Sequence, residues 1–300
     1  MTAAMQTNVK AIFMQSLGDL AAQFNDYLKI ATVLPSDTDK TEYNWLGASP
    51  PMNEWMDKRQ LRGLRPYSYT LTNKHWEATL EINRDAFNDN KLGHIPMRGR
   101  GLTRSYLKRI LEEVFSKLDG GAADAATFDV GYFFKDDRTI ADSGTIDNLV
   151  SGAYSGSAAE FRAGLLVAVG RMLNFKDDWG KPLGLMPDTI VCSPAMYMAL
   201  KDAIFTPSVQ GTPRPETEFV KNGIVVSPWI DADTDDWYIL CTTEEIKPII
   251  FQDRQKPEVT SLDKPDSQDA FMKNTIYYGI DARFVVGFGD PRTAIKVVDV

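Results

Sequence analysis

The stretch of this sequence with the most obvious potential for chemistry is the acidic run DADTDD, Asp231 to Asp236. Its carboxylates at alternate positions are similar to the start of a calcium-binding loop. An EF-hand loop also requires glycine at its sixth position and a bidentate glutamate at its twelfth, and these places hold Asp236 and Thr242. The sequence therefore predicts a solvated acidic turn between two strands, with weak cation binding as the alternative.

Histidine and cysteine, which often bind metals or act as nucleophiles, are too few and too dispersed here to form a site. The chain has two histidines, His75 and His94, and two cysteines, Cys192 and Cys241. A structural zinc site needs four such ligands, so we expect no metal site. Both histidines fall in polar segments and are expected in solvated loops. Both cysteines end apolar runs and are expected as buried, reduced thiols.

The glycine motifs do not support a catalytic or cofactor site either. GFGD, residues 287–290, has no helix after it, which predicts a bend before Pro291 and not a dinucleotide-binding turn. GRG, residues 99–101, lacks the Lys-Ser/Thr of a phosphate-binding loop, so a flexible joint is expected, with anion binding as the alternative. Glu112 and Glu113 are expected on a solvated helix face. We predict no catalytic residue, no cofactor and no metal.

The composition is that of a soluble globular protein. With 300 residues, the length predicts about two domains. A net charge of −8 argues against nucleic-acid binding through a broad basic face. The start MTAAMQTNVK lacks the pattern of a signal peptide, and the apolar run GLLVAVG is far too short to span a membrane. We expect no membrane partner.

The spacing of apolar residues predicts an α+β fold with a helical N-terminal arm. Apolar residues three and four apart predict helices over 8–30 and 102–119, and a Ser157–Glu160 capping box begins a helix that runs to about Asn174. Ser193 and Pro194 are expected to cap a further helix that ends at Ile204. Strands are predicted at Thr189–Cys192, GIVVS, WYILC, KPIIFQ, NTIYYGIDARFVVGFG and TAIKVVD.

Residues 66–83 contain two alternating runs that predict an isolated β-hairpin. Apolar and polar residues alternate on both sides of a short turn at 73–75. The apolar positions are Tyr67, Tyr69, Leu71, Trp76, Ala78, Leu80 and Ile82. The flanking segments offer no third strand, and a two-stranded ribbon alone is marginal in water. Another surface must therefore cover this hairpin.

A Trp-rich segment, YNWLGASPPMNEW at residues 43–55, lies just before the hairpin. Gly47, Pro50 and Pro51 are expected to prevent a regular helix or strand. Trp45 and Trp55 each carry a large apolar surface that is costly to leave in water. We expect both rings to be buried against the body of the protein or against a neighbour.

These segments together resemble the Mu-like phage major head subunit (gpT) family. The resemblance covers nearly the whole chain, although residues 120–220 match only in pattern. Asn53, Asp57 and the pair Asn88-Asp89 depart from the family, which weakens any assignment of contacts there. The matching positions are Tyr43, Trp45-Leu46-Gly47, Pro51, Met52, Glu54-Trp55, Arg59, Asn73, Glu77, Arg84-Asp85, Asp89, Leu92-Gly93, and the stretch YYGIDARFVVGFGDPRTAI with Tyr278-Gly279, Arg283, Gly287 and Gly289.

The resemblance implies the Hong Kong 97-type major capsid fold and its division into parts. These are an N-terminal helical arm and tether (1–60), an extended β-hairpin loop (61–97), a spine helix with the first part of a peripheral domain (98–145), an axial domain (146–262) and final strands of the peripheral domain (263–300). The hairpin would reach across a neighbouring subunit. The residues then expected between subunits are Trp45, Trp55, Arg59, Tyr67, Tyr69, Leu71, Trp76, Leu80, Ile82 and Arg84.

The implied function is a phage head protein without catalytic activity, which assembles into an icosahedral shell around DNA. Its partners would be further copies of itself in hexamers and pentamers, a portal, scaffolding or decoration proteins, and double-stranded DNA held without sequence-specific contacts. Assembly would take place in the cytoplasm of a bacterial host, and the protein would end in the virion capsid. The alternatives are an encapsulin-like shell around protein cargo and an enzyme with an unrecognised active site.

Overall fold

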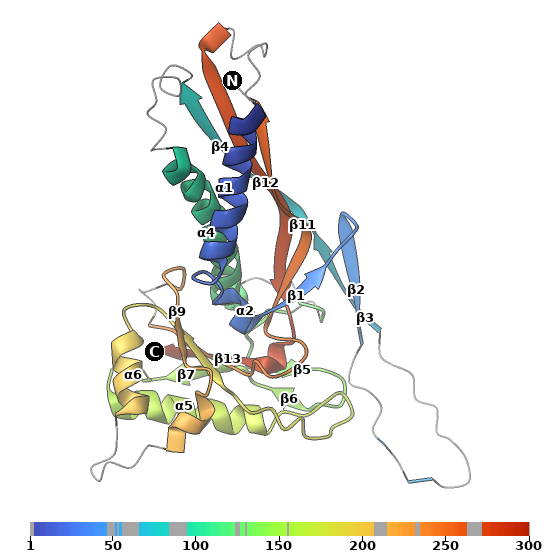
Figure 1. Cartoon of the computed structure of the whole chain (residues 1–300). Helices are drawn as coiled ribbons and strands as arrows, with labels where there is room; N and C mark the ends of the chain where they lie inside the picture. Colours follow the sequence, from blue (N-terminus) through green and yellow to red (C-terminus); the bar gives the residue numbers. More distant parts are fainter. Residues whose placement is uncertain are drawn as a thin grey trace.

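The protein is described by a computed structural model, shown in Figure 1, in which two larger sheets are stacked along an elongated molecule and two further sheets have two strands each. The structure describes residues 3–46, 52, 54–55, 66–83, 95–123, 127–129, 131–154, 156–206, 215–231, 235–262 and 272–299. The helices are α1 (Ala3–Ala21), α2 (Tyr27–Ile30), α4 (Ile95–Asp119), α5 (Ala158–Leu173) and α6 (Tyr197–Phe205), with 3-10 turns η2 (Gly120–Ala122), η3 (Pro215–Phe219) and η4 (Pro291–Thr293).

The strands are β1 (Ala31–Pro35), β2 (Lys40–Leu46), β3 (Pro66–Thr72), β4 (Lys74–Asn83), β5 (Arg138–Thr139), β6 (Thr145–Ile146), β7 (Leu149–Gly152), β8 (Thr189–Cys192), β9 (Ile224–Val226), β10 (Trp237–Leu240), β11 (Ile249–Leu262), β12 (Thr275–Phe288) and β13 (Ala294–Asp299). The longest strands are β11 and β12, with 14 residues each.

One sheet, in the order β1-β11-β12-β4, forms the elongated upper part of Figure 1. β11 and β12 pair antiparallel along their whole length, and β4 pairs antiparallel with β12. Helix α4 packs on this sheet and α1 packs on α4. The hydroxyls of Ser16 and Thr103 lie 2.7 Å apart between the two helices. The N-terminal helix is therefore part of the folded body.

The other sheet, in the order β7-β13-β10-β8-β9, lies below it and carries α5 and α6. Every residue of β8 and β10 is buried, because side chains on both faces of the sheet are covered. Trp237 belongs to the core beneath α5, whereas Tyr238, the next residue, belongs to the core shared with α4. Because successive side chains of β10 point to opposite faces of the sheet, this strand contributes to both cores.

The predicted hairpin of residues 66–83 is wrong. β3 pairs antiparallel with β2, and β4 pairs with β12 in the upper sheet. The short turn at 73–75 suggested local pairing, but Asn73 is a corner that is fixed from outside: the amide of Gln252 donates a hydrogen bond of 2.8 Å to Asn73 Oδ1. The strand that β4 needs is supplied by β12, near the other end of the chain.

The two-stranded ribbon is instead made by β2 and β3, with residues 47–65 between them. It projects to the right of the body in Figure 1. Residues 43–46 are therefore strand, although the segment 43–55 was expected to be irregular. The range 61–97 does not form one extended loop, because β4 is an integral strand of the upper sheet.

Several local predictions are confirmed. The amide of Glu160 donates to the Ser157 hydroxyl, which caps α5 as the capping box predicts. The predicted strands from residue 189 onward are all present. Asp290 caps the turn at Pro291, so the chain bends there.

Other local predictions are wrong. Residues 99–101 lie inside α4 and do not form a flexible joint, and the helix expected over 8–30 is divided into α1 and α2. Helix α6 begins at Tyr197 and not at Ser193. Residues 263–300 were expected to be strands of the peripheral domain, together with the spine helix, but β13 lies in the lower sheet between β7 and β10. β11 was expected in the axial domain (146–262), but it lies in the upper sheet. The remaining domain boundaries stay predictions.

Candidate assembly surfaces

The root of the β2–β3 ribbon is anchored in the body of its own subunit. Tyr69 and Leu71 are only 8% and 6% exposed. The amide of Phe288 donates a 3.0 Å hydrogen bond to the Tyr69 hydroxyl. Gly287 allows this approach, since a Cβ there would lie 2.5 Å from the Leu71 side chain. Both residues were expected between subunits, but in this structure they pack against their own subunit.

A second contact at the root passes through a buried amide. The Tyr43 hydroxyl donates a 2.7 Å hydrogen bond to Gln252 Oε1. Gln252 is fully buried in β11, and its amide nitrogen in turn holds Asn73. Neither Gln252 nor its role was found from the sequence, because Gln252 follows the apolar run Ile249–Phe251 and precedes Asp253 and Arg254, so its position resembles the polar end of a strand.

Farther along the ribbon, the chain presents apolar side chains to solvent. Trp55 is 66% exposed, so it is not buried against the body of its own subunit. Met52 is also exposed. The side chains of Trp45 and Tyr67, and all of Arg59 and Arg84, lie outside the described residues.

A groove opens between α4 and the upper sheet. It has a volume of about 340 Å³ and is lined mainly by Trp76, Tyr106, Ile280 and Phe284, with Glu77 among the residues at its wall. The Trp76 ring stacks on Phe284, with centroids 5.5 Å apart and an interplanar angle of 26°. The predicted alternation of β4 is confirmed, since Trp76, Leu80 and Ile82 are half-buried while their neighbours are exposed.

Arg109 of α4 closes one side of this groove. Its guanidinium lies 4.1 Å from the centroid of the Trp76 ring, a cation–π geometry. Arg109 also forms ion pairs with Glu112, at 3.1 Å, and with Glu113. The acidic pair predicted on a solvated helix face is therefore partly used to position Arg109. The groove combines a rigid aromatic wall with a fixed cation.

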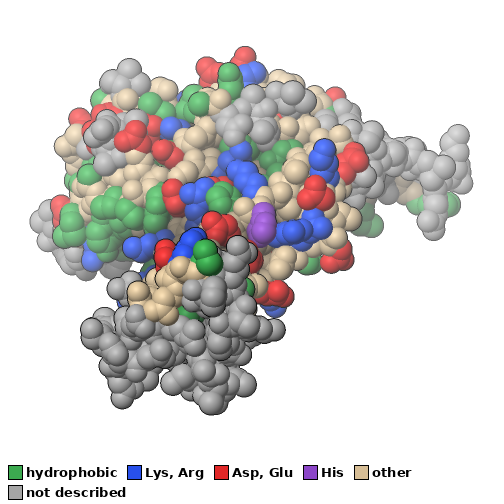
Figure 2. Space-filling view, turned by 90° about the horizontal axis from the view of Figure 1, so that it is seen from above, with side chains coloured by type: hydrophobic (Ala, Val, Ile, Leu, Met, Phe, Trp, Pro, Cys, Tyr) green, Lys and Arg blue, Asp and Glu red, His purple; other side chains and the backbone are tan. Residues whose placement is uncertain are grey.

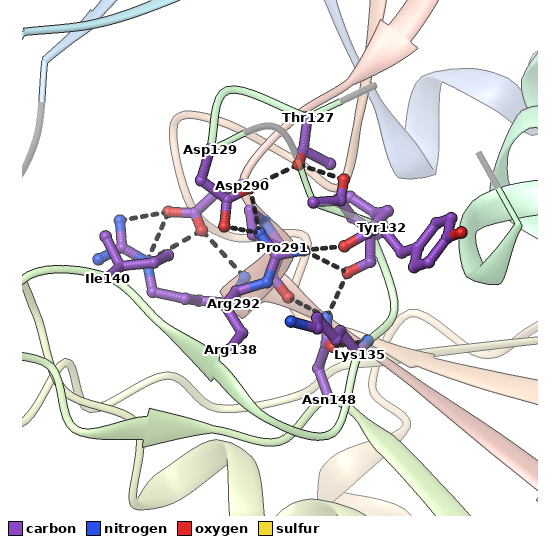
Figure 3. Close-up of polar contacts among 12 residues, drawn as sticks. Thr127, Asp129, Tyr132, Lys135, Arg138, Ile140, Asn148, Asp290, Pro291 and Arg292 are labelled. Atoms are coloured by element: carbon purple, nitrogen blue, oxygen red, sulfur yellow. Dashed lines mark hydrogen bonds and ion pairs between the residues drawn. The ribbon is translucent and has the colours of Figure 1, made fainter. Parts of the chain in front are cut away.

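A buried ionic network joins the two halves of the molecule (Figure 3). Arg138 is buried and donates to both carboxylate oxygens of Asp129, at 2.7 and 2.6 Å. In the same region, Arg292 pairs with Asp290, at 2.6 Å, and with Asp178, at 3.0 Å. Burial alone would lower the pKa of Arg292, but these two carboxylates outweigh it and raise the pKa. Burial has the larger effect on Arg138 and lowers its pKa.

Asn148 completes this junction without any charge. Its amide nitrogen donates to the carbonyls of Phe133, at 2.8 Å, and Pro291, at 2.9 Å. Its Oδ1 accepts from the amide of Lys135, at 2.8 Å. The side chain is fully buried. Because η4 connects β12 to β13, this network fixes the crossing between the sheets.

Within the described part of the chain, the groups singled out in the sequence are not brought together into a catalytic constellation. Cys192 and Cys241 are buried free thiols, as expected. Burial raises the pKa of Cys192 to about 12 and raises that of Cys241 as well. His75 lies in β4, where its ring is 3.3 Å from the Asp281 carboxylate. The prediction that His75 lies in a loop is therefore wrong. His94 lies outside the described residues.

The acidic run also differs from its prediction. Asp236 is buried and forms a 2.7 Å ion pair with Lys296, so this end of the run is not solvated. Residues 232–234 lie outside the described residues. Among the residues that the structure describes, no cluster of histidine, cysteine and acidic side chains could hold a metal ion, and no helix is long and apolar enough to span a membrane. In the view from above, charges of both signs are interspersed on the surface (Figure 2).

Comparison with known proteins identifies the family. Residues 2–162 and 212–299 match the family model described as Mu-like prophage major head subunit gpT. The chain belongs to this family. Two members are each 25% identical to it: the Mu-like prophage FluMu major head subunit of Haemophilus influenzae, over 94% of this chain and 70% of that protein, and the major capsid protein of Escherichia phage Mu, over 98% and 72%.

Solved capsid structures confirm the fold of this Mu-like head subunit. The procapsid of bacteriophage JBD30 matches with a TM-score of 0.59 and 25% identity, over 100% of this chain and 77% of that chain. The virus-like particle from Pyrococcus furiosus matches with a TM-score of 0.58 at 10% identity, over 97% and 98%, which shows the fold alone. The chain has the Hong Kong 97-type fold. It is a structural head protein, and the encapsulin-like alternative is not favoured.

Proposed function

We propose that copies of this chain assemble as hexamers and pentamers into the icosahedral shell of a phage head, which encloses double-stranded DNA. The observation that carries this proposal is the family match over residues 2–162 and 212–299. The fold supports it, since the capsid subunits of known particles share its arrangement over the whole chain.

We propose that the segment of residues 47–65 of one subunit docks in the groove between α4 and the upper sheet of a neighbour. Trp55 and Met52 are exposed apolar anchors, and aromatic anchors in apolar pockets commonly dominate such interfaces.

In this arrangement the expected interface residues divide into three groups. Trp45, Trp55, Arg59 and Tyr67 would act on the ribbon, and Trp76, Leu80, Ile82 and Arg84 on the receiving surface. Tyr69 and Leu71 would hold the root of the ribbon in place, so that its far end meets the neighbour in a fixed direction. This division replaces the single hairpin that the sequence predicted.

We further propose that the protein has no catalytic role and that its other partners are a portal and scaffolding or decoration proteins. Assembly would occur in the cytoplasm of the bacterial host. The net charge of −8 supports contact with packaged DNA that is weak and independent of sequence, because a broad basic face is what tight nucleic-acid binding requires.

Electron microscopy and sedimentation of the purified chain test the proposed function. We expect closed shells, which sediment as very large particles. A chain that forms only small, stable oligomers with folded subunits, under every condition in which related head proteins assemble, would contradict a shell function and favour the enzyme alternative.

A further inference from the structure

The outer ridge of α4 carries a row of cations. Arg100, Arg104 and Lys108 are four residues apart and all three side chains are exposed. Residues at this spacing lie on one side of a helix, and the row spans about 12 Å at 1.5 Å per residue. It stands out in a chain whose net charge is −8.

These cations are not neutralised by the part of the chain that the structure describes. None of the three forms an ion pair or hydrogen bond with a described residue, whereas Arg109, on the next face of the helix, pairs with Glu112 and Glu113. Glu112 is the acidic residue that continues the row, and it lies 3.1 Å from Arg109. Like charges four residues apart destabilise a helix. Repulsion within the row therefore destabilises α4, and no described acidic residue pairs with these cations to offset it.

The surface between the cations is small and polar. Gly101 and Ser105 are exposed there, and a Cβ added at Gly101 would meet no atom within 4 Å. Protein interfaces depend on a few large aromatic or apolar anchors, and this ridge offers none. Cations with small residues between them are suited to phosphate groups, which Arg and Lys contact without reading a sequence.

We propose that the ridge of Arg100, Arg104 and Lys108 contacts the phosphate backbone of the packaged DNA. This inference rests on the proposed function, in which the shell encloses double-stranded DNA. The contact is electrostatic and weak, because it uses few cations on an otherwise acidic subunit. It therefore tethers DNA to the shell without fixing its position.

The test compares two triple variants of the full-length, unassembled subunit. One is Arg100→Gln/Arg104→Gln/Lys108→Gln, which keeps good helix formers at each position. The matched control is Lys176→Gln/Lys181→Gln/Lys221→Gln, which removes the same charge from exposed positions away from α4. Fluorescence anisotropy of a labelled duplex of random sequence is measured as a function of salt concentration.

Three phosphate contacts correspond to a slope of about −2.7 in log affinity against log salt, or about a 40-fold loss between about 50 and 200 mM salt. We expect the ridge variant to lose that part of the slope and at least about tenfold in affinity at the lower salt. The control variant should match the unmodified chain. Both variants should still form shells of normal size, as seen by microscopy.

Equal affinities and slopes for the two variants would overturn the inference, as would an unmodified chain that does not bind the duplex. A ridge variant that binds DNA normally but forms no shells would also overturn it, since the ridge would then contact protein. In each case normal shells of the control leave the proposed function intact. If circular dichroism shows that the triple variant is unfolded, Arg104→Gln alone must lower the slope by about one third.

Discussion

The two sheets of this subunit differ in how completely one chain covers them. In the lower sheet every residue of β8 and β10 is buried. In the upper sheet, β11 begins with buried residues at Ile249–Gln252 and ends exposed at Leu262, and β4 alternates between half-buried and exposed residues. The lower sheet is therefore complete within one subunit. In the upper sheet β12 stays largely buried along its length, whereas β11 becomes exposed beyond the residues that pair with β1. These less covered strands are where a neighbour can contribute.

The largest effect is expected where the two sheets meet. In Arg292→Gln the buried carboxylates of Asp178 and Asp290 lose the guanidinium. Removing one partner of a buried pair typically costs about 3–5 kcal/mol, and we expect this loss in the free energy of unfolding of the dissociated subunit, measured with urea. Arg254→Gln is the control, because its partner Asp39 is largely exposed, and it should cost less than about 1 kcal/mol. Similar losses in both variants would contradict a special role for the junction.

A smaller loss is expected at the root of the ribbon. Leu71→Ala removes a buried side chain that packs on Gly287, and such changes cost about 3 kcal/mol. Leu262→Ala, at the exposed end of β11, should stay within about 0.5 kcal/mol. Thermal and urea unfolding of dissociated subunits measure both. If Leu71→Ala were neutral there and prevented only assembly, the root would belong to the interface and not to the subunit.

Trp55→Ala separates the stability of the subunit from its assembly. Because Trp55 is 66% exposed, we expect the free energy of unfolding of the subunit to change by less than about 0.5 kcal/mol. The cost of about 3 kcal/mol that is typical of truncating an aromatic side chain in a packed core is therefore not expected. Shell formation should be lost, and Trp55→Phe should restore part of it. Normal shells from Trp55→Ala would refute the proposed docking.

The smallest effect is expected within the lower sheet. With the pKa of Cys192 raised to about 12, only about one thiol in ten thousand is ionised at pH 8, and the thiolate is the reactive form. Cys241 is also buried, with a raised pKa. We expect neither thiol to react with a disulfide reagent in the folded subunit, and both to react after denaturation. Rapid reaction in the native state would show that this sheet opens.

Local patterns in the sequence predicted most of the elements but not their partners. The alternation of 66–83 identified two strands correctly, since β3 and β4 are both real. Which strand each one pairs with depends on residues far away: β12 follows β4 by about two hundred positions, and the corner at Asn73 is held by Gln252. A short turn is evidence for local pairing only when nothing else binds it.

The buried polar residues of the junction could not be predicted from the sequence either. Arg138, Asn148 and Arg292 are buried polar residues, a class that is rarely buried unless paired. Nothing in the local sequence of each one distinguishes it from a surface residue, because its partners come from other segments. The Trp-rich segment gave a clearer signal for Trp55, which is 66% exposed in the subunit; its burial against a neighbour stays a prediction.

The length of β11 and β12 has a mechanical consequence. Each strand has 14 residues, about 46 Å at 3.3 Å per residue. The two strands pair from the junction to the far end of the upper sheet, where β12 also pairs with β4. Their pairing shifts register between Asp253 and Gln255 and again between Gln255 and Glu258, and such bulges bend a strand locally. We expect the pair of strands to flex at this point. Identical subunits can then follow the different local curvatures of a closed polyhedron, while the ends of β11 and β12 at the junction keep one conformation.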